Sequence, residues 1–296
     1  MLHRTIDRFL EGQRWLEPLS DTLQGWAGAI FRSRAGQALK TLLNGTWLGH
    51  PLHPVITDLP LGAWTLAVLL DVVFLFDRSS TWHAAATVAI AAGVVAAVGA
   101  AVTGYTDWSD TVDRERRVGV THGLLNLAAT ILYLVSLLIR LYGGSAGAAI
   151  TISWIGYLLL LAAAFLGGEL VFNIGTGVNH HTWEAPITEW TPAIRVGELA
   201  EGVLQKADVR GTPVLLHRKG TVICAIGNTC GHAGGPLNEG TVEGTRVICP
   251  WHASRFDLCS GAVKGGPATV NQVRYETRVQ DGQVEVRRSP ETYQPN

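Results

Sequence analysis

The sequence of 296 residues lacks a charge excess of either sign, because 23 Lys and Arg face 24 Asp and Glu. Such a balance offers no basic footprint for a polyanion, so we expect no nucleic acid among the partners. No low-complexity tract and no repeat with a fixed period of a few tens of residues is visible. The N-terminus has no short apolar core followed by a small-residue cleavage site, so no signal peptide is expected.

Charged residues are scarce between about residues 59 and 170. Four apolar runs in this region approach or reach the roughly 20 residues that cross a bilayer. The runs cover 61–76, 84–102, 123–141 and 150–170. A soluble bundle of buried helices is the alternative, but its helices would carry a polar stripe. The run AAATVAIAAGVVAAVGAAV has no charge and mostly small residues, which favours close helix packing in a membrane. We therefore expect an α-helical membrane bundle with four transmembrane helices.

The basic residues beside these runs predict an orientation. On one side lie the N-terminal arm and the loop between the second and third runs, with Arg4, Arg8, Arg14, Arg32, Arg34, Lys40, Arg114, Arg116 and Arg117. The other side has only Arg78 and Arg140, both close to membrane ends. Because Lys and Arg accumulate on the cytoplasmic side of short loops, we expect a multi-pass protein of the cell membrane (the inner or plasma membrane) with both termini in the cytoplasm.

The first 47 residues form an amphipathic arm. Apolar residues recur there at near-helical spacing among charges: Leu10, Trp15, Leu19, Leu23, Trp26 and Ile30. Trp together with Arg suits a helix that lies on the membrane surface. A helix that packs on the bundle is the alternative reading.

The chain becomes polar after the fourth run. Following a linker at 180–189, short β-branched segments are separated by Gly, Asn and Asp: TPVLLHR, TVICAIG, TRVICP, YETRVQ and QVEVRR. This pattern predicts a small all-β domain of antiparallel strands at 190–290, followed by a tail at 291–296.

Two loops of this domain each offer one cysteine and one histidine. Cys230 and His232 form Cys-x-His, and Cys249 and His252 form Cys-x-x-His after a gap of sixteen residues. One zinc ion could take all four side chains. However, Cys-x-His is a poor half of a zinc finger, whereas two Cys on one iron and two His on the other is the ligand set of a Rieske [2Fe–2S] centre.

The surrounding text, CGHAGGPLNEG and CPWHASRFDLCSGAVKGGPA, resembles the Rieske family over nearly the whole C-terminal third. The resemblance implies one [2Fe–2S] cluster, with Cys230 and Cys249 on the inner iron and His232 and His252 on the outer iron. It also implies that Gly234, Ser254 and Pro267 surround the cluster, Ser254 as a hydrogen-bond donor to sulfur and Pro267 in a covering loop.

Some positions depart from the family pattern. Gly235 and Trp251 stand where the respiratory branch has two cysteines that form a disulfide, so that bridge is missing. Cys224 and Cys259 are therefore expected to be thiols, which suits a reducing cytoplasm.

Two further departures lie in the second loop. Phe256 replaces a tyrosine that donates to the cluster in the high-potential branch, and Ala253 replaces a glycine. With one donor fewer, the potential is expected in the lower, ferredoxin-like part of the Rieske range.

The membrane part has motifs of its own. They are GHPLHPVITDLPLGAWTLAVLLD, TGYTDWSDT, VGVTHGLLNLAATILYLVSLLIR and LGGELVFNIGTGVN. Together they resemble the four-span membrane family DUF2231 over 48–179. The resemblance implies architecture and brings no established activity.

Histidines and carboxylates gather at the ends of the apolar runs on one expected side. The best candidates for a second cofactor, haem or another metal, are His53 and His122, with His50 and Asp58 beside them. His180, His181, Asp107 and Asp110 lie on the same side. The alternative is that these are ordinary polar residues at the interface, with Asp capping helices.

Two carboxylates fall within the runs themselves. Asp71 lies in the first run and Glu169 near the end of the fourth. Intramembrane carboxylates are functional candidates, although Asp71 could simply pair with a polar neighbour such as Asn126.

These features predict a membrane-anchored iron–sulfur protein that carries single electrons on the cytoplasmic face. Its expected partners are the lipid bilayer and a soluble electron donor or acceptor protein, with a quinone as a further candidate. Two alternatives stay open. One is a membrane oxidoreductase whose cluster reduces a second metal, a haem or a lipid-soluble substrate bound by the helices. The other is a redox sensor. No catalytic residue can be named from the sequence.

Overall fold

The computed structural model describes residues 2–290. The expected tail at 291–296 and the side chain of Arg4 lie outside the described part. The chain forms two compact units, one made of Met1–Arg32 and Leu52–Thr176 and the other of Ser33–Pro51 and Gly177–Asn296. The arm expected at 1–47 is thus divided, because residues after Arg32 belong with the β-rich unit.

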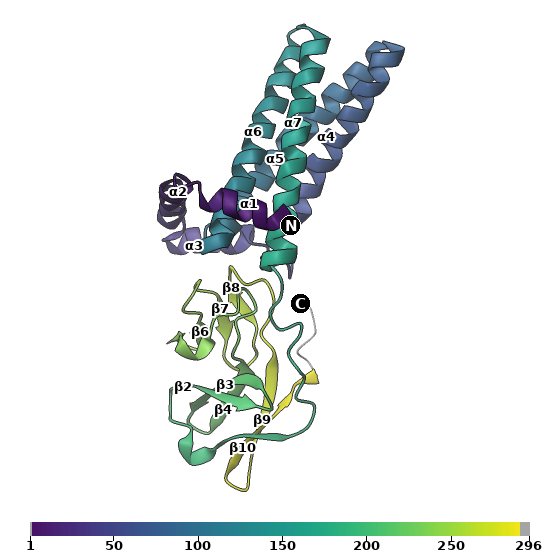
Figure 1. The fold of residues 1–296 in the computed structure, drawn as a ribbon. Helices are drawn as coiled ribbons and strands as arrows, with labels where there is room; N and C mark the ends of the chain where they lie inside the picture. The colour runs from purple at the N-terminus through teal and green to yellow at the C-terminus, as the bar shows by residue number, and fades with distance from the viewer. Residues whose placement is uncertain (1, 291–296) are drawn as a thin grey trace. The chain divides into compact units, whose positions relative to one another are not determined.

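Four long helices dominate the helical unit (Figure 1). They are α4 (Leu52–Asp77), α5 (Ser80–Trp108), α6 (Asp113–Leu141) and α7 (Ala146–Gly168), the last continued by the π-helical turn η1 (Glu169–Ile174). All four are long and apolar enough to cross a bilayer, which confirms the expected spans. Each continues beyond its apolar run, so polar residues such as His53 and His122 lie on helices. Helix α4 begins at Leu52, so Pro54 lies in its first turn, where a missing N–H donor costs little.

The interior of this bundle depends on small residues. Gly93 on α5 leaves room for the Trp64 indole, because a Cβ there would lie 2.2 Å from Trp64 Nε1. Trp64 stacks in turn on Tyr133, with ring centroids 4.1 Å apart. Such close contact between helix backbones and large side chains is typical of helix packing in membranes.

A buried ion pair lies toward the C-terminal ends of α4 and α6. Arg140 Nη2 donates to Asp71 Oδ2 at 2.6 Å, and both side chains have no exposed area. Asp71 thus pairs with Arg140 and not with Asn126, whereas Arg140 lies in the last turn of α6, near the end of the span as expected. Arg140 reaches Asp71 because its long side chain turns inward, where the paired charges avoid lipid.

Two shorter helices, α1 (Leu2–Glu11) and α2 (Leu16–Phe31), complete this unit. Leu10 and Leu16 are buried against α5 and α6, and Arg116 forms ion pairs with Glu17 and Asp21 of α2. The apolar face of the arm is nevertheless only partly covered, since Trp26 keeps 62% of its surface exposed.

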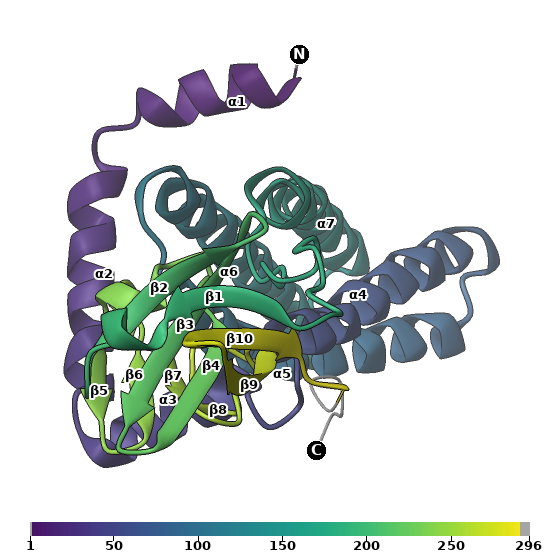
Figure 2. The same cartoon turned by 90° about the horizontal axis from the view of Figure 1, so that it is seen from below.

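The second unit contains helix α3 (Arg34–Leu43) and two antiparallel sheets (Figure 2). The six-stranded sheet has the order β1-β10-β9-β4-β3-β2, with β1 (Thr191–Arg195), β2 (Leu204–Val209), β3 (Thr212–Lys219), β4 (Val222–Gly227), β9 (Arg274–Gln280) and β10 (Gln283–Arg288). The four-stranded sheet has the order β5-β6-β7-β8, with β5 (Thr241–Glu243), β6 (Arg246–Ile248), β7 (Arg255–Asp257) and β8 (Val263–Gly265). The 3₁₀ turns are η2 (Val196–Glu198) and η3 (Leu237–Glu239). The five strand-like segments of the sequence correspond to β3, β4, β6, β9 and β10, which confirms the all-β expectation.

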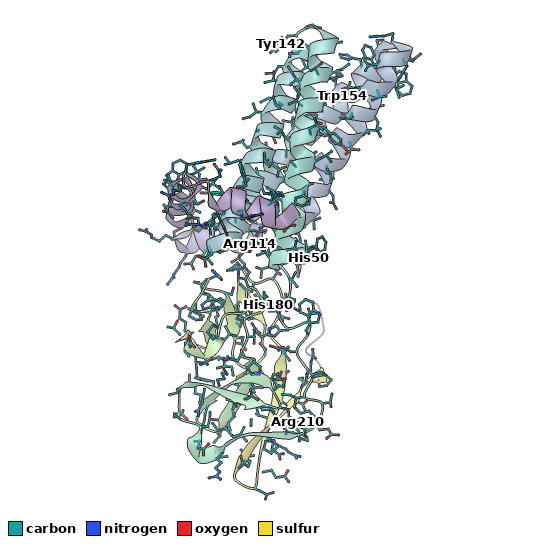
Figure 3. The ribbon with its side chains drawn as sticks, in the orientation of Figure 1. His50, Arg114, Tyr142, Trp154, His180 and Arg210 are labelled. Carbon is teal, nitrogen blue, oxygen red and sulfur yellow. A yellow bond between two sulfur atoms is a disulfide. The ribbon has the colours of Figure 1, made fainter. Side chains whose placement is uncertain are left out.

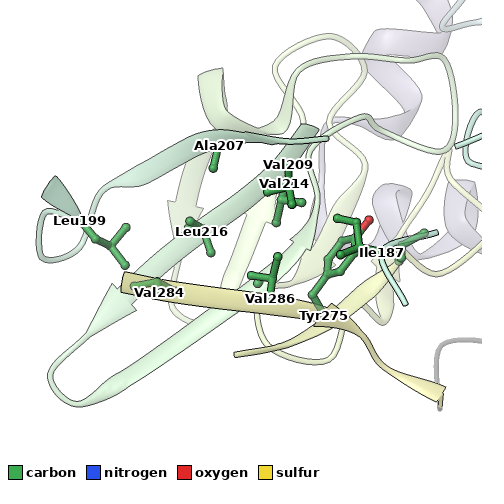
Figure 4. Packing of buried hydrophobic residues seen from close by; sticks show 11 residues of the cluster. Ile187, Leu199, Ala207, Val209, Val214, Leu216, Tyr275, Val284 and Val286 are labelled. Atoms are coloured by element: carbon green, nitrogen blue, oxygen red, sulfur yellow. The ribbon is translucent and has the colours of Figure 1, made fainter. Parts of the chain in front are cut away.

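Alternation along β3 and β4 divides the core of this unit in two. Leu216 and Ala225 face one cluster, which includes Val284 and Val286 of β10 (Figure 4). Their neighbours Leu215 and Ile226 face the second cluster, as the two-residue period of a strand requires. That second cluster also contains Cys230, Cys249 and Phe256, so the candidate ligand loops rest on a hydrophobic base.

Cys224 and Cys259 form a disulfide, which corrects the expectation of two thiols. Cys224 is buried on β4, and Cys259 lies in the exposed turn after β7. The pairing is a long-range contact over 35 residues, and no local sequence pattern reported it.

Candidate metal centre

The two loops that carry the candidate ligands are built alike. In the first loop, Cys230 N–H donates to Gly235 O and Gly234 N–H donates to Cys230 O, both at 2.8 Å. In the second, Cys249 N–H donates to Ser254 O at 2.9 Å and Ala253 N–H donates to Cys249 O at 3.1 Å. Each cysteine therefore begins a loop that is closed by the same pair of backbone bonds.

The equivalence extends to the backbone conformation. Gly234 has φ +79° and Ala253 has φ +58°, so the fourth residue after each cysteine is left-handed. Glycine adopts this region freely, whereas alanine does so at a cost. Ala253, which replaces the usual glycine, therefore adopts the same loop conformation at an energetic cost.

These loops bring the candidate side chains together as two pairs, the thiols and the imidazoles. Cys230 and Cys249 are buried, and their thiols are hydrogen-bonded to each other. The rings of His232 and His252 lie with centroids 5.1 Å apart and planes at 83°. His232 Nδ1 is buried without a hydrogen-bond partner, which is unusual for a polar atom. A nitrogen in this state, beside a second imidazole and in loops that also pair two thiols, fits a metal cluster better than a packed core.

Burial sets the protonation of these groups. It lowers the pKa of His232 to about 3, and the nearby His252, His180 and Lys40 lower it further. The shared hydrogen bond lowers the pKa of Cys249 to about 6 and, together with burial, raises that of Cys230. Neutral imidazole and thiolate are the forms that bind metal, so His232 and Cys249 are already biased toward ligation.

Gly235 allows the two loops to approach each other. A Cβ there would lie 2.8 Å from Cys249 Sγ and 3.1 Å from the indole of Trp251. Gly235 and Trp251, which stand where the respiratory branch of the family has its two disulfide-forming cysteines, are therefore neighbours. Trp251 itself is 56% exposed beside His252, which gives the cluster end an aromatic surface.

The residues expected around the cluster lie as follows. Ser254 is fully buried, and its Oγ accepts from Ala268 N–H at 3.1 Å, which leaves its own hydrogen available for a sulfur. Pro267 precedes Ala268 in the loop after β8, after a cis peptide bond. A Cβ on Gly234 would lie 3.5 Å from Nδ1 of His180, a residue labelled in Figure 3. Phe256 is fully buried in the cluster of apolar residues that contains both cysteines.

Sequence reasoning missed the contribution of the α3 segment, which we define as Ser33–Pro51. Its Thr46 Oγ1 donates to Ala268 O at 3.1 Å, and its Thr41 Oγ1 accepts from Gly266 N–H at 3.4 Å. Arg255 Nη2 also donates to Gln37 Oε1 at 2.9 Å. The α3 segment therefore holds the proline loop from outside, although about 220 residues separate the partners. A polar helix carries no signal for so distant a contact.

A second missed feature lies behind the first loop. His181 Nδ1 is 3.0 Å from Glu184 Oε2. With the Gln272 amide oriented so that its nitrogen faces His181, that nitrogen donates to His181 Nε2, and the amide oxygen accepts from Gly231 N–H at 3.1 Å. This buried chain of polar groups supports the backbone between Cys230 and His232. His181 was expected among the histidines at the membrane ends. Its spacing of three residues from Glu184 was the one sequence signal for the contact that the structure shows.

The remaining candidates for a second cofactor do not form one group. His50 is exposed, with its Nδ1 3.1 Å from Pro51 O, and Asp58 lies on an exposed position of α4. His53 and His122, by contrast, face each other inside the helical bundle with ring centroids 6.3 Å apart.

Comparison with known families divides the chain in the same way. Residues 49–180 match the family described as "Predicted membrane protein (DUF2231)", and residues 189–281 match the "Rieske [2Fe-2S] domain" family.

Individual relatives match the C-terminal third. The ferredoxin subunit of anthranilate 1,2-dioxygenase from Burkholderia cepacia is 35% identical over 103 residues, which is 35% of this chain and 95% of that protein. The ferredoxin component of a naphthalene 1,2-dioxygenase system from Pseudomonas putida is 29% identical over 93 residues, or 31% and 89%. Among solved structures, the ferredoxin of carbazole 1,9a-dioxygenase from Nocardioides aromaticivorans IC177 is 28% identical with a TM-score of 0.33, covering 34% of this chain and all of that one.

Proposed function

Because the chain belongs to the Rieske [2Fe–2S] family and joins its Rieske domain to a DUF2231 membrane domain, we propose that it is a membrane-anchored carrier of single electrons. The observation that carries this proposal is the pair of matched loops with two buried thiols and two facing imidazoles. The bound [2Fe–2S] cluster supplies the one-electron chemistry, and the chain supplies its ligands and surroundings.

In this proposal Cys230 and Cys249 hold the inner iron, and His232 and His252 hold the outer one. The burial of both thiols and the unpartnered Nδ1 of His232 support this division. Trp251, exposed beside His252, offers a surface on which a redox partner could dock.

The proposed partner is a soluble redox protein. The relatives named above are ferredoxin components of dioxygenase systems, and a component of such a system works together with other proteins. A membrane tether would keep such a carrier beside a partner in the same membrane, which raises their effective concentration without any new contact.

We place the Rieske domain on the cytoplasmic side. Arg8, Arg14 and Arg32 of the N-terminal arm and the basic residues at the start of α6 support this side. The disulfide between Cys224 and Cys259 favours an oxidising compartment instead, so sidedness needs a direct test.

Spectroscopy of the purified full-length protein tests the electron-transfer proposal. We expect two irons and two sulfides per chain and the rhombic paramagnetic-resonance signal of a reduced Rieske centre. Cys249→Ser and His232→Cys should remove or alter that signal. His217→Ala is the control, because it removes a histidine of the same domain, on β3, outside the proposed ligand set. A preparation with one zinc and no iron or sulfide would overturn the assignment.

A further inference from the structure

The helical unit contains an internal duplication of two helical hairpins. Three positions on α4 have counterparts 69 residues later on α6: His53 and His122, Trp64 and Tyr133, Asp71 and Arg140. Three positions on α5 have counterparts 63 residues later on α7: Gly93 and Gly156, Ala100 and Ala163, Gly104 and Gly167. The repeat was not detected in the sequence, because the equivalent positions of its two halves share few residue types.

The equivalent positions have equivalent surroundings. Gly93 would crowd Trp64 if it had a Cβ, and Gly156 would crowd Tyr133 in the same way. Buried residues also recur in register along the two hairpins, for example Ala86 with Ala149. The hairpins α4–α5 and α6–α7 are therefore related by an approximate two-fold axis through the bundle.

Three pairs of side chains meet across this axis. Asp71 contacts Arg140 at 2.6 Å, and Trp64 stacks on Tyr133. The third pair, His53 and His122, has perpendicular rings with centroids 6.3 Å apart. In each of the first two pairs the partners complement each other, by opposite charge in the ion pair and by ring stacking in the aromatic pair. The histidine pair brings two like groups together edge to face, without the charge complementarity of the ion pair or the parallel stacking of the second pair.

Both histidines are held in the same way by the neighbouring helix. His53 Nδ1 is 2.9 Å from Ala100 O, and His122 Nδ1 is 2.8 Å from Ala163 O. A carbonyl only accepts, so each Nδ1 carries the hydrogen and each Nε2 keeps its lone pair. The Asn126 amide, 3.1 Å from His122 Nε2, agrees with this tautomer and would be displaced when that nitrogen binds a metal. An Nδ1–H that donates to a backbone carbonyl is the usual support for a histidine that binds metal through Nε2.

The distance between the rings also fits a shared metal. Two imidazoles that bind opposite sides of one metal ion at about 2.0–2.1 Å have ring centres about 6 Å apart. Within residues 2–290, no group of three or more His, Cys, Asp or Glu side chains is placed to hold one metal ion. A bare ion here would thus have too few protein ligands, whereas a porphyrin brings four equatorial nitrogens of its own.

Glycines let the neighbouring helix pack closely against both rings. A Cβ on Gly104 would lie 2.6 Å from His53 Cε1, and one on Gly167 would lie 3.3 Å from His122 Cε1. Both glycines lie one helical turn after the carbonyl that holds the ring, and they are equivalent under the two-fold axis. We propose that His53 and His122 are the two axial ligands of a haem in the helical unit. This site goes beyond the proposed Rieske function and does not depend on it.

The test uses the full-length protein, expressed with a haem precursor, purified in detergent and titrated with hemin. We expect one haem per chain with the optical spectrum of a six-coordinate, low-spin iron. His53→Ala and His122→Ala should each weaken haem binding at least ten-fold, while the Rieske resonance signal survives. His83→Ala is the matched control, since His83 lies in the same bundle on α5 beside Phe74 and Arg140.

A conservative variant separates ligation from a structural role. His53→Met should retain haem with a shifted spectrum, because Met and His together also bind haem iron axially. The proposal fails if wild-type protein binds no hemin saturably, or if His83→Ala loses as much haem as His53→Ala. It also fails if zinc or copper binds the pair stoichiometrically without porphyrin.

Discussion

At the scale of single residues, hydrogen bonds to the cluster should set its potential. Phe256→Tyr should raise the midpoint and Ser254→Ala should lower it, because each hydrogen bond to sulfur favours the electron-rich reduced state. A net bond of about 1 kcal/mol corresponds to about 40 mV for one electron. Redox titration followed by paramagnetic resonance measures both values, and unchanged midpoints in both variants would contradict the role given to this loop.

The left-handed alanine makes a separate prediction about stability. Ala253→Gly should raise the free energy of unfolding by about 1 kcal/mol, because glycine adopts the φ of +58° without a Cβ clash. Gly234→Ala, at the equivalent place in the other loop, should lower it. Thermal unfolding of the cluster-loaded protein measures both. Equal stability of all three proteins would show that the loop tolerates alanine without strain.

Much of the candidate site could be predicted from the identities of its residues. The Cys and His spacings named the four proposed ligands, because cluster ligation imposes types and intervals that local sequence retains. The disulfide, the Asp71–Arg140 pair and the support of Gly231 by His181 and Gln272 were not foreseen. Each joins residues distant in the chain, and nothing in a local pattern records such partners.

At the scale of elements, the α3 segment should tune the cluster. Lys40 lies close enough to His232 to lower the pKa of that ring, so its charge reaches the cluster end. A positive charge stabilises the more negative reduced state, so Lys40→Gln should lower the midpoint. A change of about 0.5 kcal/mol corresponds to about 20 mV. Lys40→Arg should keep the wild-type value, and added salt should reduce the difference. A midpoint insensitive to Lys40 would remove α3 from the electrostatics of the site.

Periodicity predicted the long elements well and their ends less well. The apolar runs identified all four membrane helices, but each helix continues into polar residues such as His53 that hydropathy excludes. The strands β5, β7 and β8, each three residues long, escaped because so short a segment shows no alternation. The division of the arm at Arg32 depends on packing against a distant loop, which periodicity does not report.

At the scale of the whole molecule, the orientation in the membrane is testable. A reporter fused after Asn296 should read as cytoplasmic, and one inserted between Gly144 and Ser145 as external, if the basic flanks decide the topology. The opposite reporter pattern would place the Rieske domain outside the cytoplasm, where its disulfide would need no further explanation.

The disulfide has a consequence for the order of assembly. Cys224 and Cys259 enclose all four proposed ligands in a covalent ring with a separation of 35 residues. Closing such a ring removes about 3–4 kcal/mol of chain entropy from the unfolded state. If the disulfide forms before iron arrives, it would hold the two ligand loops close together for a protein that delivers the cluster. If it forms afterwards, it would slow the loss of a cluster that is already bound.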